Sequence, residues 1–168
     1  VQIFLGIQIP GGSLKQGGIR VESTFRTEQG VVDEFKAMEQ QLVKKVCDYL
    51  MKLYYSPDMK MIDFYAQIEC KLCIPQETMK KLLRRTTTTI SREMLYKIVV
   101  GTGMDVDTAN SFFQMSRGGE LNPDALNDLI VINALLDHDK IEDFIDEYRE
   151  KVGINIGSYI KSDKKSDD

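Results

Sequence analysis

The 168-residue chain lacks the features of a membrane-spanning or secreted protein. No apolar run approaches the ~20 residues that cross a bilayer. The apolar residues 1–10 have neither a basic leader nor a small-residue cleavage pattern, which argues against a secretory signal. The sequence therefore predicts no membrane partner.

Cysteine is scarce, with only Cys47, Cys70 and Cys73 in the chain. An odd set without an export signal predicts reduced, buried thiols and a cytoplasmic location rather than a disulfide framework. The spacing of Cys70 and Cys73 is typical of zinc ligands, but a structural zinc site needs four ligands. Because Cys47 and His138 lie far away in the sequence, we predict no metal and no other cofactor.

Histidine is limited to His138, which stands between two aspartates and is expected in a turn between helices. A serine or cysteine hydrolase would need this ring beside a nucleophile and an orienting acid, and no pattern indicates one. The glycine pairs at 11–12 and 17–18 lack the Gly-Lys-Ser/Thr ending of a phosphate-binding loop. No catalytic residue is predicted, and the chain is not expected to be an enzyme.

What the chain does contain is ordinary for a folded protein: 42% hydrophobic and 29% charged residues, enough for one sizeable core. The predicted fold is mainly α, a helical bundle with a helix-turn-helix-like core and a short N-terminal β-hairpin. The hairpin occupies residues 1–30, where apolar residues alternate and glycine pairs interrupt them.

Residues 31–57 are predicted to form a long amphipathic helix. Apolar residues recur there at steps of three and four and stop near Pro57; they are Val31, Phe35, Met38, Leu42, Val46, Leu50 and Leu53. A helix facing the core is favoured, and a helix that pairs with its twin in a dimer is the alternative.

Residues 58–156 are predicted to form a domain of shorter helices, followed by a polar tail at 157–168. The residues expected to start helices are Asp58, Pro75, Ser91, Asp105, Asn122 with Pro123, and Asp139. Gly101 and Gly103 are expected to end a helix, and the four threonines at 86–89 to form a loop.

The stretches 73–82 (CIPQETMKKL) and 91–98 (SREMLYKI) resemble the phage-repressor helix-turn-helix family, of the Cro/C1 or XRE type. The resemblance extends over about residues 58–150, where 104–113 and 121–148 are similar to an extended helical version found in bacterial chains. It implies that the helix beginning at Pro75 is the recognition helix and that the next helix packs behind it. Glu69, Cys73 and the threonine loop depart from the family pattern of a small residue, a glycine, and a loop with Gly or Pro.

Charge is divided unevenly along the chain, although the net charge is only −4. The segment 71–97 has two acids, Glu77 and Glu93, and a basic cluster of Lys71, Lys80, Lys81, Arg84, Arg85, Arg92 and Lys97. Residues 120–150 have ten acids, six of them at 137–147. We expect that acidic run to be a solvated, helix-capping face rather than a cation site.

The basic cluster predicts contact with a phosphate backbone, because each neutralised phosphate releases counterions. The predicted site residues are Gln76 and Thr78 for base edges and Lys80, Lys81, Arg84 and Arg85 for phosphates. The first hypothesis is therefore a dimeric transcriptional regulator bound to double-stranded DNA. The alternative is a protein interaction or oligomerisation module of the same architecture; the acidic total, Glu69 and the threonine loop favour it.

Overall fold

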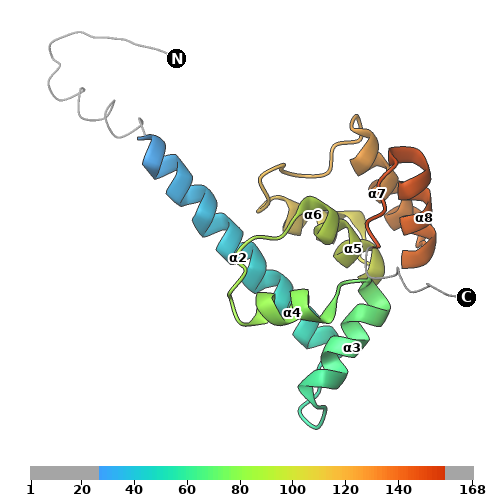
Figure 1. The fold of residues 1–168 in the computed structure, drawn as a ribbon. Helices are drawn as coiled ribbons and strands as arrows, with labels where there is room; N and C mark the ends of the chain where they lie inside the picture. Colours follow the sequence, from blue (N-terminus) through green and yellow to red (C-terminus); the bar gives the residue numbers. More distant parts are fainter. Residues whose placement is uncertain (1–26, 158–168) are drawn as a thin grey trace, which may run out of the picture. The chain divides into compact units, whose positions relative to one another are not determined.

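A computed structural model describes residues 27–157. Residues 1–26 of the predicted hairpin lie outside them, and residues 28–30, which the prediction assigned to the hairpin, form the start of helix α2 (Glu28–Tyr54). The described part is mainly α, with no strand and these helices: α2 Glu28–Tyr54, α3 Met61–Leu72, α4 Gln76–Leu83, α5 Arg92–Thr102, α6 Val106–Phe113, α7 Leu126–Asp137 and α8 Ile141–Val152 (Figure 1). Among the described residues, none of the helices has the length and apolar character needed to cross a membrane.

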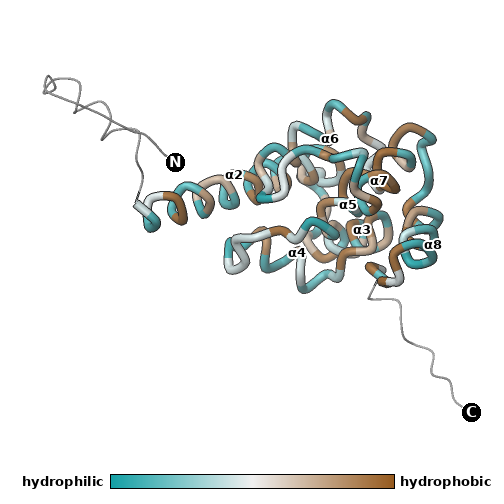
Figure 2. Tube along the Cα trace, turned by 90° about the horizontal axis from the view of Figure 1, so that it is seen from above, coloured by the Kyte–Doolittle hydropathy of each residue, from teal (hydrophilic) through white to brown (hydrophobic). Residues whose placement is uncertain are grey.

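The chain divides into two units, Val1–Lys36 and Ala37–Asp168, and α2 carries the boundary between them. Within the second unit, five residues on successive turns of α2 are buried: Leu42, Val43, Val46, Cys47 and Leu50. Hydrophobic and hydrophilic residues alternate along the helix (Figure 2).

The apolar stripe predicted along α2 continues past its buried part in both directions. Val31, Phe35 and Leu53 are 37, 40 and 46% exposed, so they do not belong to the core. Periodicity shows which residues share a face of a helix, but it does not show how far a neighbouring element covers that face.

Helix α5 lies at the centre of the second unit, where it packs against α3, α7 and α8. Its six consecutive residues from Leu95 to Val100 are all buried, which requires neighbours around the whole helix. Two large buried side chains contact it through the Tyr96 ring: the ring centroids of Phe113 of α6 and Tyr148 of α8 lie 5.8 and 5.9 Å from that of Tyr96.

The predicted caps of α5 and α6 are confirmed. The Ser91 hydroxyl accepts a hydrogen bond from the Met94 N–H at 3.1 Å, and the Asp105 carboxylate accepts one from the Thr108 N–H at 2.7 Å. Gly103 ends α5 in the left-handed conformation, with φ of 73°.

Other predicted boundaries were wrong by a few residues. Lys60 and Lys140, rather than Asp58 and Asp139, precede α3 and α8, and neither provides a side-chain cap. The Asn122-Pro123 pair forms a turn before α7 in which the Asn122 side chain accepts a hydrogen bond from the Asp124 N–H. Gly101 does not end α5 but lies inside it.

Gly101 sets how closely α5 approaches α3. A Cβ atom at this position would lie 2.5 Å from Leu72 Cδ2 and 3.0 Å from the Lys71 carbonyl oxygen. We expect Gly101→Ala to destabilise the fold by about 1–3 kcal/mol through overpacking, measured by urea unfolding. A gain of about 1 kcal/mol, the ordinary helix-propensity effect, would show instead that the two helices can separate freely.

Candidate nucleic-acid interface

The predicted interface is built on α3, α4 and the three residues between them. Cys73 ends α3 in the left-handed conformation, with φ of 57°, and its N–H donates to the Glu69 carbonyl at 3.0 Å. Cys73 and Ile74 are buried, and Pro75 precedes α4 in an extended conformation. The result is a tight connection that lays α4 beside α3 (Figure 1).

One side of α4 fixes the helix to the core. Met79 and Leu82 are fully buried. Glu77, Lys81 and Arg84 follow one another at steps of four and three and are all exposed, so they form an outward stripe on one helix face.

The six predicted site residues do not all lie on that outward stripe. Lys81 and Arg84 do, but the Gln76 amide donates to the Glu69 carboxylate at 2.8 Å and is held against α3. Thr78 is half-buried at the wall of a cavity. One third of the Lys80 side chain is exposed, and its Nζ lies 4.0 Å from Glu77 Oε1.

Arg85 closes the C-terminal end of α4. Its backbone is left-handed, with φ of 60°, and its guanidinium donates to the Leu82 carbonyl at 3.1 Å. The N–H groups of Thr86 and Thr87 donate to the Lys81 carbonyl at 3.0 and 3.3 Å. The threonine segment is a loop as predicted, and it supplies donors to the Lys81 carbonyl at the helix end, where carbonyls lack partners within the helix.

Two members of the predicted basic cluster point into the protein. Arg92 lies in a network with Asp128, and Lys97 is only 6% exposed. Neither is available to a phosphate backbone, which corrects the expectation that the whole cluster forms one surface.

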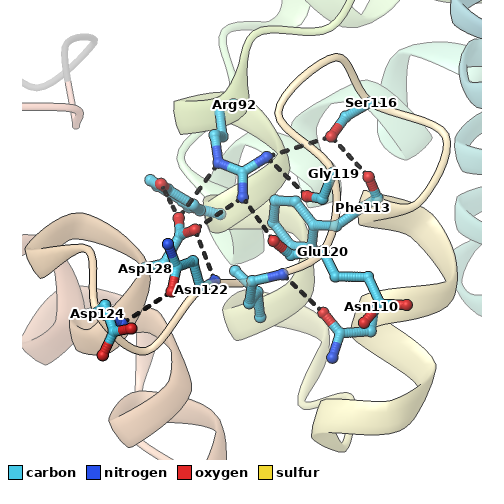
Figure 3. Close-up of polar contacts among 11 residues, drawn as sticks. Arg92, Asn110, Phe113, Ser116, Gly119, Glu120, Asn122, Asp124 and Asp128 are labelled. Carbon is cyan, nitrogen blue, oxygen red and sulfur yellow. Dashed lines mark hydrogen bonds and ion pairs between the residues drawn. The ribbon is translucent and has the colours of Figure 1, made fainter.

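Figure 3 shows the Arg92 guanidinium between α7 and the loop that follows α6. It donates to both carboxylate oxygens of Asp128, at 3.2 and 2.8 Å, and to the carbonyls of Gly119 and Glu120 and the Ser116 hydroxyl. A Cβ on Gly118 would lie 2.6 Å from an Arg92 nitrogen, so a side chain there would displace the guanidinium from its present position.

Asp128 is the other half of the network and is 4% exposed. It also accepts from the Tyr96 hydroxyl and from the Asn122 N–H. Burial opposes ionisation, but the hydrogen bonds from Arg92, Tyr96 and Asn122 outweigh it and lower the pKa of Asp128. Burial and the same carboxylate raise the pKa of Tyr96, so the network holds an ionised aspartate and a neutral tyrosine.

Lys97 joins two distant segments. Its ammonium donates to the Cys73 carbonyl in the α3–α4 connection and to the Ile156 carbonyl after α8, both at 2.7 Å. Burial lowers the pKa of Lys97. This one side chain ties the start of α4 to the segment that follows α8.

The metal and catalytic predictions turned on the cysteines and the histidine, all of which lie within residues 27–157. No group of three or more potential metal-ligating side chains comes together there. Cys47 and Cys73 are buried as predicted. Cys70 is exposed, because it lies on the outward side of the last turn of α3. His138 ends α7 in a left-handed turn with φ of 57°, which confirms its predicted position.

Comparisons with protein-family models, with curated proteins and with solved structures found no match.

Proposed function

We propose that the chain binds double-stranded DNA through the outward face of α4, as a helix-turn-helix regulator. The observation that carries the proposal is the placement of Lys81 and Arg84 on an exposed face of a short helix whose opposite face is fixed by Met79 and Leu82. A cationic helix face opposite a face that is fixed to the core suits the major groove, which admits one α-helix.

The structure changes which side chains would read bases. The Gln76 amide is held by Glu69 and Thr78 faces a cavity, whereas the Glu77 side chain is 66% exposed on the outward stripe. A carboxylate there can accept from cytosine N4. In the proposal, Glu77 and Lys81 contact base edges while Lys80, Arg84 and Arg85 contact phosphates.

A homodimer remains part of the proposal. Two copies would place their α4 helices on half-sites about 34–36 Å apart, or a multiple of that spacing. Sedimentation of the protein alone and with duplex DNA would give the stoichiometry.

The first test is binding to a mixed pool of genomic duplex fragments as the salt concentration rises. With the three phosphate contacts of the proposal, the slope of log K against log salt should be about −2.7. Lys81→Glu with Arg84→Glu should weaken binding by about ten- to a hundredfold and flatten the slope by about 0.9, because only Arg84 of the two contacts a phosphate. Arg85 is left unchanged because it caps α4.

The matched control makes the same charge change elsewhere. Lys140→Glu with Lys151→Glu alters α8 and the residue that precedes it, and α8 packs mainly on α5 and α7. DNA binding by this control should stay within about threefold of wild type, because salt screens the attraction between DNA and charges that lie more than a Debye length from it. Equal losses in both double variants would mean that the attraction is general and that α4 is not the interface.

The second candidate is a protein interaction module of the same architecture. The exposed Glu77 carboxylate among the α4 cations favours it, because a carboxylate in a groove lined by phosphates is repelled. Absence of DNA retention by the folded protein at low salt would make this the preferred function.

A further inference from the structure

A cavity of about 240 Å³ lies where α4 begins, between the start of α5 and the segment after α8. Ile74, Thr78, Glu93, Met94, Lys97 and Asn155 are among the residues that line it. The cavity is smaller than the ~300–1,000 Å³ of sites for drug-sized ligands, so it suits a small metabolite.

Lys97 gives the cavity a buried positive charge. An ammonium has three N–H donors, and the hydrogen bonds to Cys73 and Ile156 use two of them. Within residues 27–157, Lys97 forms no ion pair. Burying a cation without a counterion costs free energy. An anionic ligand group in the cavity would act as the counterion of Lys97.

Glu93 gives the same cavity a negative charge. It lies four residues before Lys97 on α5, hence on the same helix face, yet the two side chains are not paired. The wall also holds the Thr78 hydroxyl and the Asn155 amide, whose oxygen already accepts from the Gly157 N–H at 3.0 Å. Ile74 and Met94 provide apolar surface beside these groups.

We propose that this cavity is a binding site for a free aliphatic α-amino acid. The ligand carboxylate pairs with Lys97, its ammonium pairs with Glu93, and its side chain lies against Ile74 and Met94. Separated opposite charges on one wall select a zwitterion over a simple acid or amine, because either of those leaves one protein charge unpaired.

The proposed amino-acid site is distinct from the DNA-binding face, but both include residues of α4. Thr78 belongs to the first turn of α4, and Lys97 donates to the Cys73 carbonyl in the connection that precedes this helix. A ligand in the cavity would therefore stabilise the start of α4. Amino-acid binding is measured without DNA, so its outcome is independent of the proposed function.

The test is thermal unfolding and calorimetric titration of the whole chain with each of the free amino acids. An aliphatic amino acid at about 100 times its dissociation constant should raise Tm by about 5–10 °C. The matching amine without a carboxylate and the matching acid without an amine should each bind at least about tenfold more weakly.

Glu93→Gln and Thr78→Val test the location, since replacement of Lys97 would also disturb the fold. Glu93→Gln should weaken binding at least about tenfold and Thr78→Val about threefold or more. Glu142→Gln, the same change at an exposed position of α8, should leave it unchanged. No Tm shift with any amino acid, or binding that both cavity variants leave intact, would overturn the proposal.

Discussion

Asp128→Ala should lower the free energy of unfolding by about 3–5 kcal/mol, the usual effect of removing one partner from a buried ion pair. The carboxylate is 4% exposed and accepts hydrogen bonds from Arg92, Tyr96 and Asn122. Its removal leaves the guanidinium and the tyrosine hydroxyl without their acceptor. In a domain of this size Tm should fall by about 6–20 °C, measured by calorimetry.

Asp124→Ala is the matched control for this prediction. Asp124 lies in the turn before α7 with an exposed side chain, and Figure 3 shows it beside the network. Its loss should change stability by less than about 0.5 kcal/mol. Equal, small effects of the two changes would mean that Arg92 reorients to other acceptors and that the ion pair does not hold α5 to α7.

The network should also give the protein a defined acid sensitivity. Because the folded pKa of Asp128 is lowered from its ordinary value of 3.8, its stabilising effect is present above that pH and is lost as the pH falls through the folded pKa. The stability difference between wild type and Asp128→Asn should therefore be constant near neutral pH and shrink below about pH 3.8. A difference that persists unchanged into stronger acid would contradict the pKa shift.

Lys97→Met should cost about 2–4 kcal/mol, because it leaves the carbonyls of Cys73 and Ile156 without the donor that serves both. The methionine keeps most of the stem and removes only the ammonium. Besides a lower unfolding midpoint in urea, we expect faster proteolysis after the end of α8, where Ile156 loses its tie to α5. A Tm loss without faster cleavage there would show that the segment is held by other contacts.

Lys44→Met is the control, because the Lys44 side chain is 69% exposed and its ion pair with Asp48 joins neighbouring turns of α2. Such a surface pair contributes only about 0.3–0.5 kcal/mol. A control effect as large as that of Lys97→Met would show that the loss reflects any lysine change rather than the buried bridge.

Local signals in the sequence predicted local structure well. A serine or aspartate before an apolar run predicted the caps at Ser91 and Asp105, since a short side-chain acceptor can reach an N–H three residues on. The threonine loop and the turn at His138 were predicted on the same grounds of propensity.

The candidate site was predicted only in part. Counting charges along 71–97 gave Arg92 and Lys97 the same weight as Lys81 and Arg84, although the first two are turned inward. A signal was present: Lys97 is the one charged residue between Leu95 and Val100, and Asp128 lies in an apolar helix. A lone charge in an apolar run indicates a buried, partnered group, but it does not show which distant residue is the partner.

The sequence by itself determined that residues 31–156 are mainly helical, where α5 and α6 begin, and which residues of a helix share a face. Those properties depend on contacts within about four residues along the chain. Only the tertiary structure decided that α5 is central, that Arg92 meets Asp128 and that Lys97 joins Cys73 to Ile156. These contacts span 24 to 59 residues, and the direction of each side chain follows from how whole helices pack rather than from its neighbours in sequence.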